Sequence, residues 1–484
     1  MIILFYLNMK RFIQGQDRTQ STLLPELLDE YIAEDNPVRV IDIFVDQLAL
    51  SALGFEGVNP AQTGRPSYHP AAMLKLYIYG YLNRIQSSRR LEAEANRNVE
   101  LMWLIARLNP DFKTIARFRN ENGPAIRKVC SQFVELCRRL NLFADSMVAI
   151  DGSKFKAVNS SDNNYTQAKI KSRMQAVEKN IQQYLDDLEA ADISSPKQST
   201  PHQARLTERI AMFQAQMKVL ETIEAKVQST PDKQLSQTDP DARSMQHRGG
   251  GMVGYNVQAA VDTQHHLIVA HEVTTAGHDR AQLSNMGKQA KDALQKEMLT
   301  VVADKGYYKG EEVVACVESG ITPIMPKCLT SGNKANGLFD KRHFVYDPKS
   351  NTYQCPAGEL LIERFRSLEK GRPHITYWSS SCKNCTLKSS CTTSDQRRIK
   401  RWENEAVLDQ MQSNLENMPD AMKIRRCTIE HTFGTLKHWM GASHFLMKTK
   451  AHVSTEMSLH ILAYNMKRVI SIMGSVALMK AMVA

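Results

Sequence analysis

The spacing of apolar residues predicts that the N-terminal part of the chain is helical. One run repeats large apolar residues three and four positions apart, as a helix with a buried face requires: Leu74, Tyr77, Ile78, Tyr81 and Leu82. Polar, proline-containing breaks at residues 63–66 and 109–111 separate successive helices. We therefore interpret residues 1–142 as a helical domain. Its repeated helix–break–helix units suggest DNA binding, although solvated helix faces are an equally simple interpretation.

From residue 146 onward the pattern changes to short, β-branched apolar runs, which predict buried strands. These runs lie at residues 146–151, 255–261, 267–273, 299–303 and 321–324. A helical stretch at residues 279–296 separates the third run from the fourth. The second and third runs are close enough to form a hairpin, so we expect a mixed sheet. The α/β domain is expected to consist of residues 143–164 and 236–332.

A helical insert is predicted at residues 165–235. Apolar residues step by four and three along two segments, namely Ile170, Met174, Val177, Ile181, Tyr184 and Leu188, and then Leu206, Ile210, Phe213, Met217 and Leu220. This heptad spacing predicts an antiparallel coiled-coil hairpin. An ordinary helical pair packed on the body is the alternative.

Composition adds a candidate partner and a compartment. The chain has 484 residues, enough for about three domains, and 42% of them are hydrophobic. Lys and Arg number 62 against 51 Asp and Glu, and the net charge of +11 favours a polyanionic partner such as nucleic acid. No apolar run is long enough to span a membrane, and the apolar start at residues 1–7 lacks the features of a signal peptide, so we interpret it as an extension or a frayed strand. Nine cysteines are too few for a disulfide scaffold, which favours the reducing cytoplasm.

Three acidic residues occupy settings that suit catalysis. Asp151 and Asp304 each end an apolar strand, and Glu430 lies on a predicted helix. Neighbouring strand ends can bring two carboxylates together, and a helix packed on the sheet can add a third. Carboxylates in such a group suit Mg²⁺ or Mn²⁺, and a pair of these ions suits displacement at a phosphodiester. An acid at a strand end is also often a plain surface residue, so the residues alone leave both interpretations open.

The predicted helix that carries Glu430 also carries a row of cations. Arg426 precedes Glu430 by four residues and Lys437 follows it by seven, so all three share one helical face. Such a face can hold a DNA backbone beside a metal site. An Arg–Glu pair that stabilises the helix is the alternative.

Four of the nine cysteines are concentrated at residues 355–391, within a block at 333–404 that we expect to be irregular. The spacing is Cys355, then Cys382-x2-Cys385-x5-Cys391. Thiolates at this spacing suit tetrahedral zinc, and four protein ligands leave no open catalytic position. We expect a structural Zn²⁺ site here, with four reduced cysteines in a disordered loop as the alternative.

These motifs, taken together, resemble the bacterial insertion-sequence transposases of the DDE class. The resemblance rests on Ala-Ile-Asp151-Gly-Ser, Val-Ala-Asp304-Lys-Gly-Tyr and Arg426-x3-Glu430-x6-Lys437, and on the N-terminal segment that begins Gly64-Arg-Pro-Ser-Tyr-His-Pro. It covers residues 12–473. It implies a ribonuclease H-like core in which Asp151, Asp304 and Glu430 bind two Mg²⁺ or Mn²⁺ ions. Residues 405–484 would then be the C-terminal helical part of that core.

One position departs from the family signature, because the tyrosine expected three residues before Arg426 is Lys423. The role of that tyrosine at the DNA end is therefore in doubt for this chain. The long separation of Asp151 from Asp304 is explained by the helical insert.

The resemblance implies a DNA transposase that binds the terminal inverted repeats of its own element, cuts the DNA and joins the strands to a target. Its expected partners are double-stranded transposon ends and target DNA, and a second or further copy of the chain. It would act at the bacterial nucleoid. The residues expected to bind DNA are Arg426, Lys437, Lys423, Arg397, Arg398, Arg401, Arg65 and Arg117. Two alternatives are a non-catalytic DNA-binding protein derived from a transposase, and a metal-dependent nuclease with the same core.

Overall fold

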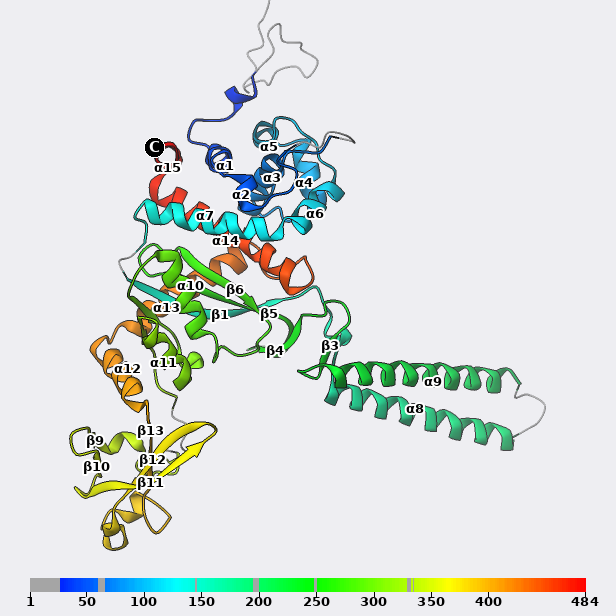
Figure 1. Cartoon of the computed structure of the whole chain (residues 1–484). Helices are drawn as coiled ribbons and strands as arrows, with labels where there is room; N and C mark the ends of the chain where they lie inside the picture. Colours follow the sequence, from blue (N-terminus) through cyan, green and yellow to red (C-terminus); the bar gives the residue numbers. More distant parts are fainter. Residues whose placement is uncertain are drawn as a thin grey trace, which may run out of the picture.

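The computed structural model describes residues 27–59, 66–143, 146–194, 200–247, 250–328, 332–333 and 335–484. The apolar start at residues 1–7 and Arg65 lie outside these ranges. The N-terminal helices lie above a central sheet, a small β unit lies below it, and a long helical hairpin projects to the side (Figure 1). Within the described ranges, no helix is long and apolar enough to cross a membrane.

The N-terminal part is helical, as predicted. Its helices are α1 (Pro37–Asp46), α2 (Leu50–Leu53), α3 (Pro70–Leu82), α4 (Ser88–Ala95), α5 (Val99–Leu104), α6 (Phe112–Glu121) and α7 (Gly123–Arg139). Asn36 and Asp111 cap α1 and α6 by accepting hydrogen bonds from backbone N–H groups of the first turn. Helix α3 is buried on most sides rather than on one face, because α1, α5 and α14 (Lys450–Met473) all pack against it. Its buried Lys75 pairs with Asp42 and Asp46, both at 2.6 Å.

The C-terminal helices join this helical layer. Helix α14 packs against α7 and α3 on one side and against strand β6 (Ile268–Thr274) on the other, while α15 (Ser475–Val483) packs on α1. One hydrophobic cluster consequently runs from the N-terminal helices through α14 to the sheet. The N-terminal helices and the end of the chain therefore share a core.

The central sheet is mixed, which confirms the prediction. It contains β1 (Met147–Lys156), β4 (Arg243–His247), β5 (Gly250–Asp262), β6, β7 (Leu299–Val302) and β8 (Ile321–Ile324). The order is β4-β5-β1-β7-β8, with β6 on β5; β1, β7 and β8 are parallel, and β5 runs antiparallel to β1. Gly250 and Gly251 begin β5 and pair with β4.

Helices cover the two faces of this sheet. Val148 and Ile150 of β1 pack towards α10 (Leu283–Leu294) and α11 (Gly310–Glu318), together with α12 (Glu405–Asn417). Ala149 belongs to the opposite face, which α13 (Ala421–Gly434) and a π-helical turn at Thr435–Trp439 cover. Because side chains alternate along a strand, Asp151 lies on the same face as Ala149 and so towards α13.

The helical insert forms two long antiparallel helices, α8 (Gln167–Ser194) and α9 (Thr200–Ser229). A short ribbon of β2 (Asn164–Thr166) and β3 (Gln234–Ser236) links them to the body. The hairpin has its own small core, which includes Ile170, Val177 and Leu220 from the predicted heptads.

The cysteine-rich block folds into an antiparallel sheet, so the expectation of an irregular segment is wrong. Its strands are β9 (Val345–Asp347), β10 (Thr352–Gln354), β11 (Leu360–Glu369), β12 (Arg372–Trp378) and β13 (Ile399–Trp402), in the order β13-β12-β11-β10-β9. Tyr353, Leu361 and Tyr377 are central residues of its small core. The chain also forms short 3-10 turns at Leu28–Tyr31, Ser161–Asn163, Lys305–Tyr307, Lys341–His343, Ser380–Asn384 and Lys388–Ser390.

Candidate active site

Asp151 and Asp304 lie together because β1 and β7 are parallel neighbours. The pairing of Ala149 with Val302 places both acids at the level where β7 ends. Asp151 lies within β1 rather than at its predicted end, since that strand continues to Lys156 along β5. Asp304 follows β7 and accepts a hydrogen bond from the backbone N–H of Gly306 at 2.7 Å. Strand register therefore fixes the backbone of both acids.

The guanidinium of Arg425 lies between the two carboxylates. Its Nη2 donates to Asp151 Oδ2 at 2.6 Å and lies 3.9 Å from Asp304 Oδ2. The Arg425 side chain is largely buried, and its Nε has no hydrogen-bond partner among the described residues. The two carboxylates thus converge on one position that a positive charge occupies.

The pKa of Asp151 reflects the charges around this position. Burial raises the pKa of Asp151 to about 6, and the nearby carboxylates of Asp304 and Asp279 act in the same direction. Arg425 and the N–H of Gly152 oppose this rise in the pKa. Because Asp304 and Asp279 both act on Asp151, the one positive charge of Arg425 does not neutralise the three carboxylates.

Asp279, which is not among the residues expected from the sequence, lies close enough to Asp151 to act on its pKa. Helix α10 begins at Leu283, and Asp279 Oδ1 accepts hydrogen bonds from Asn256 Nδ2 at 2.7 Å and Gln258 Nε2 at 2.6 Å. Gln258 in turn accepts from the hydroxyl of buried Tyr307, three residues after Asp304. In the sequence, the polar residues Asn256 and Gln258 within the otherwise apolar strand β5 could have indicated this network.

This network explains the glycine that follows Asp151. A Cβ atom at Gly152 would lie 2.5 Å from Asp279 Oδ1 and would also collide with the amide nitrogen of Gln258. The buried Asn256 Oδ1, which has no partner among the described atoms, would be 2.9 Å away. The Asp-Gly pair in β1 therefore leaves room for three polar side chains beside the carboxylate.

Glu430 lies on α13 but not at the two aspartates. It is exposed, as are Arg426 and Lys423, whereas Arg425 is the residue of this helix that points inward. Five residues separate Arg425 from Glu430, which corresponds to about 140° around the helix. Among the described residues, no three His, Cys, Asp or Glu side chains are close enough together to hold a metal ion. The structure thus brings together Asp151, Asp304 and Arg425, with Glu430 outside the group.

Lys437, on the π-helical turn after α13, contacts β1 just beyond Asp151. Its Nζ donates to Ser153 Oγ at 2.7 Å and to the carbonyl of Lys154 at 2.8 Å, and it lies over the ring of Phe155. Burial lowers the pKa of Lys437. Lys437, Lys154 and His438 line an open cavity of about 380 Å³ next to the first residues of β5. This cavity offers the ammonium groups of Lys154 and Lys437 to a ligand.

The other arginines expected to bind DNA differ in exposure. Arg117 is exposed and pairs with Glu121 at 3.3 Å, and Arg398 stacks on Trp378. Arg397 donates to the carbonyl of Phe339. Arg401 is buried and donates to Asp409 at 2.9 Å, so its guanidinium is used inside the protein.

The four clustered cysteines line one small cavity of about 30 Å³ in the β unit. Burial raises the pKa of Cys391, and Cys382, Cys355 and Cys385 add to the rise. No disulfide links them.

Comparison with known families identifies the class. A model of the transposase DDE domain matches residues 223–466, about half of the chain, so the chain belongs to this family of transposases. Asp304, Arg425 and Glu430 lie within the match, and Asp151 precedes it. A transposase domain (DUF772) model matches residues 26–121 in the N-terminal helices. The mixed α/β sheet fits the ribonuclease H-like core expected for this class.

The protein is therefore a DDE-type DNA transposase, an enzyme of DNA cleavage and strand transfer, and the family as a whole depends on divalent metal ions. No curated protein matches the sequence. Among solved structures, the chain is similar to a piggyBac transposase in a synaptic complex with hairpin DNA. The identity is 8%, the alignment covers 93% of this chain and 79% of the other, and the TM-score is 0.32.

Proposed function

We propose that this transposase binds the terminal inverted repeats of its own insertion sequence, cuts the DNA at the repeats and joins the freed ends to a target. The observation that carries this proposal is the convergence of Asp151 and Asp304 on one cation position at the end of β7. A protein that only binds DNA has no need for two acids held together in this way.

The residues at this position fit a divalent ion, because the guanidinium of Arg425 already stands where a positive charge is required. Asp151 and Asp304 would hold two Mg²⁺ or Mn²⁺ ions, with Glu430 as the third carboxylate. When bound, such ions activate the attacking oxygen and stabilise the leaving oxygen at a phosphodiester. The network of Asp279, Gln258 and Tyr307 keeps the backbone around both aspartates in place.

The cations around the site would position the DNA backbone. Lys437 is held against β1, and with Lys154 it would present positive charge to a phosphate. Arg426 and Lys423 lie on the exposed face of α13, and Arg397, Arg398 and Arg117 would bind DNA further away. We leave the buried Arg401 out of this surface. Arg65, outside the described residues, remains a candidate with the N-terminal helices for recognition of the repeats.

The β unit would hold a structural Zn²⁺ through Cys355, Cys382, Cys385 and Cys391 once these thiols move closer together than they stand among the described residues. The support is their shared cavity in a sheet with a small hydrophobic core, which a metal would stabilise. Because two DNA ends must be handled together, we propose that the chain acts as a homodimer or a higher oligomer on DNA at the bacterial nucleoid.

The test uses labelled duplexes that carry the inverted repeats flanking the reading frame. With Mg²⁺ or Mn²⁺ the protein should cleave at the repeat and yield joined products, and Asp151→Asn and Asp304→Asn should remove both activities. Asp292→Asn, at an exposed position on α10, is the matched control and should stay active. Cleavage without joining would indicate a nuclease, and binding without cleavage a DNA-binding protein; either outcome would overturn the proposal.

A further inference from the structure

We propose that the α8–α9 hairpin is a docking surface for the hairpin of a second copy of this chain, with the two hairpins antiparallel. The inference rests on the oligomer in the proposed function and identifies the contact that would form it.

The hairpin is free of the body along most of its length. It projects from the sheet (Figure 1), and its main contacts with other elements are those with β2 and β3 at its base. The heptad residues pack against each other between the two helices and form a separate core. Both outer surfaces of a two-helix arm are therefore open to a partner.

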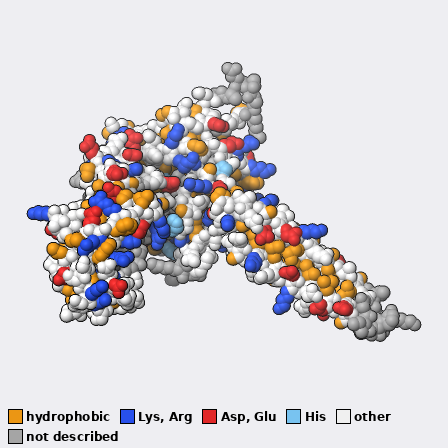
Figure 2. Space-filling view, turned by 60° about the horizontal axis from the view of Figure 1, so that its bottom comes forward, with side chains coloured by type: hydrophobic (Ala, Val, Ile, Leu, Met, Phe, Trp, Pro, Cys, Tyr) orange, Lys and Arg blue, Asp and Glu red, His pale blue; other side chains and the backbone are white. Residues whose placement is uncertain are grey.

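The outer surface of α9 exposes large apolar side chains that a fully solvated helix usually lacks. Met212 and Val219 of α9 are 56% and 57% exposed, and Leu185 of α8 is 42% exposed. Met212 and Val219 are seven residues apart, so they share one stripe of α9. Figure 2 shows hydrophobic side chains gathered along the arm. Large apolar side chains left exposed on a projecting element are typical of an interaction surface.

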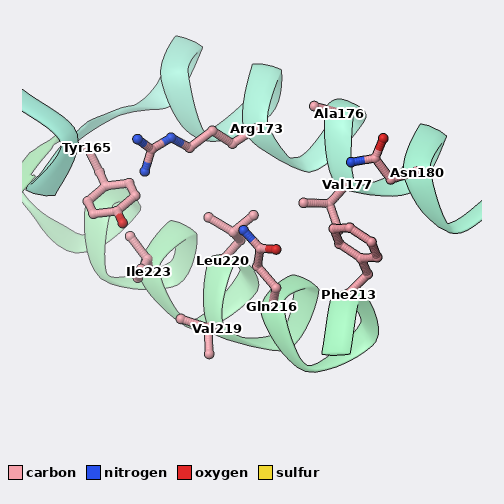
Figure 3. Close-up of a pocket in the computed structure, with 10 residues that line it drawn as sticks. All are labelled: Tyr165, Arg173, Ala176, Val177, Asn180, Phe213, Gln216, Val219, Leu220 and Ile223. Carbon is pink, nitrogen blue, oxygen red and sulfur yellow. The ribbon is translucent and has the colours of Figure 1, made fainter. Parts of the chain in front are cut away.

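A groove accompanies this stripe. An open cavity of about 560 Å³ lies between the helices, and Figure 3 shows Val177, Phe213 and Leu220 pointing into it. Ala176 and the exposed Val219 line its rim, so the apolar residues of α9 border the groove. A ridge beside a groove on the same arm can pack with its own copy, ridge into groove, around a twofold axis.

The charges on α8 determine the direction of pairing. Lys169, Lys171 and Arg173 lie at the end of α8 nearest the body, and Asp186, Asp187 and Glu189 lie towards the far end. An antiparallel pair of arms places each basic end against an acidic end, whereas a parallel pair sets like charges together. The polarity thus complements a second copy of the same arm.

The local contacts leave most of this charge available. Asp186, Asp187 and Glu189 are exposed, and so is Lys171. Arg173 lies 3.6 Å from Asp162, and Lys169 donates to backbone carbonyls. Helix α9 carries both signs in each half, with Arg205, Glu208 and Arg209 far from the body and Lys218, Glu221, Glu224 and Lys226 near it. DNA fits this arm less well, because the acidic far end would repel phosphates.

The test measures the mass of the full chain by light scattering without DNA or added metal ions, over a range of concentrations. One variant reverses the base (Lys169→Glu, Lys171→Glu, Arg173→Glu) and another the far end (Asp186→Lys, Asp187→Lys, Glu189→Lys). Each alone should dimerise at least about tenfold more weakly than the unchanged protein. An equal mixture should recover dimers, because one arm is then acidic and the other basic.

A variant with all six reversals restores the polarity in the opposite direction and should dimerise like the unchanged chain. Circular dichroism establishes that each variant is folded. A monomeric unchanged protein, single reversals without effect, or a mixture that stays monomeric would each overturn the proposal. So would reversals that alter DNA binding but not the mass. Asp151→Asn should dimerise normally, so loss of catalysis and loss of the dimer can be told apart.

Discussion

Strands β1 and β7 and helix α13 contribute to the candidate active site in different ways. Strand pairing holds Asp151 and Asp304 side by side, and a buried polar network supports both segments. On α13, Arg425 points at the two carboxylates while Glu430 points to solvent. The comparison shows that the register of parallel strands is enough to pair two acids, whereas the third depends on how a helix is rotated against the sheet.

This difference leads us to expect that the sheet provides a cation site before DNA binds and that Glu430 joins later. Glu430→Gln should then reduce cleavage of the labelled end by about a thousandfold, because one charged ligand of the reacting centre is lost. Binding of the first Mn²⁺ to the DNA-free protein should be unchanged. Full cleavage by this variant would remove Glu430 from the catalytic centre.

The buried carboxylate of Asp151 should lower the free energy of unfolding when it is ionised. The pKa of Asp151 is raised from its usual value near 3.8 to about 6, so the ionised side chain opposes folding, and the loss grows as pH rises through this range. Asp151→Asn is therefore expected to raise the free energy of unfolding by about 2 kcal/mol at pH 7 and by little at pH 4. Denaturant titrations at both pH values measure the effect. Equal stabilities at pH 7 would contradict it.

Breaking the hydrogen-bond network around Asp279 should lower the stability of the protein, by less than Asp151→Asn raises it. Asp279→Ala removes the acceptor of the buried Gln258 amide and leaves the Asn256 amide only the carbonyl of Ala276 at 3.2 Å. We expect a loss of about 1–2 kcal/mol in the free energy of unfolding. Asp292→Ala on the exposed side of α10 is the control and should change stability by less than about 0.5 kcal/mol. The idea fails if the two variants are equally stable.

The smallest expected effect compares two neighbouring arginines on α13, one buried beside the aspartates and one exposed. Arg425→Met removes the cation between Asp151 and Asp304, so the DNA-free protein should bind Mn²⁺ about tenfold more tightly. Arg426→Met changes an exposed residue and should leave this affinity as it is. Electron paramagnetic resonance of free Mn²⁺ gives both values. Weaker binding by the Arg425 variant would show that the guanidinium supports the ion rather than competing with it.

The sequence was informative where a repeating pattern carried the signal. Apolar runs predicted the strands of the mixed sheet, and acids at the ends of two of them predicted the pairing of Asp151 with Asp304. The same pattern did not reveal Arg425, because two adjacent arginines look alike until the rotation of α13 is known. Asp279 was missed because its local context suits a helix cap, while its partners lie on β5. The β unit escaped prediction because β11 is largely exposed and lacks an apolar repeat.

The most direct test of the central claim is a Mn²⁺ titration of the DNA-free protein, with Asp151→Asn, Asp304→Asn and Asp292→Asn measured alongside. If Asp151 and Asp304 already form the site, the unchanged protein and Asp292→Asn bind Mn²⁺. Asp151→Asn and Asp304→Asn should each bind it at least about tenfold more weakly. Unchanged affinity in Asp151→Asn and Asp304→Asn would contradict the assignment of the metal site.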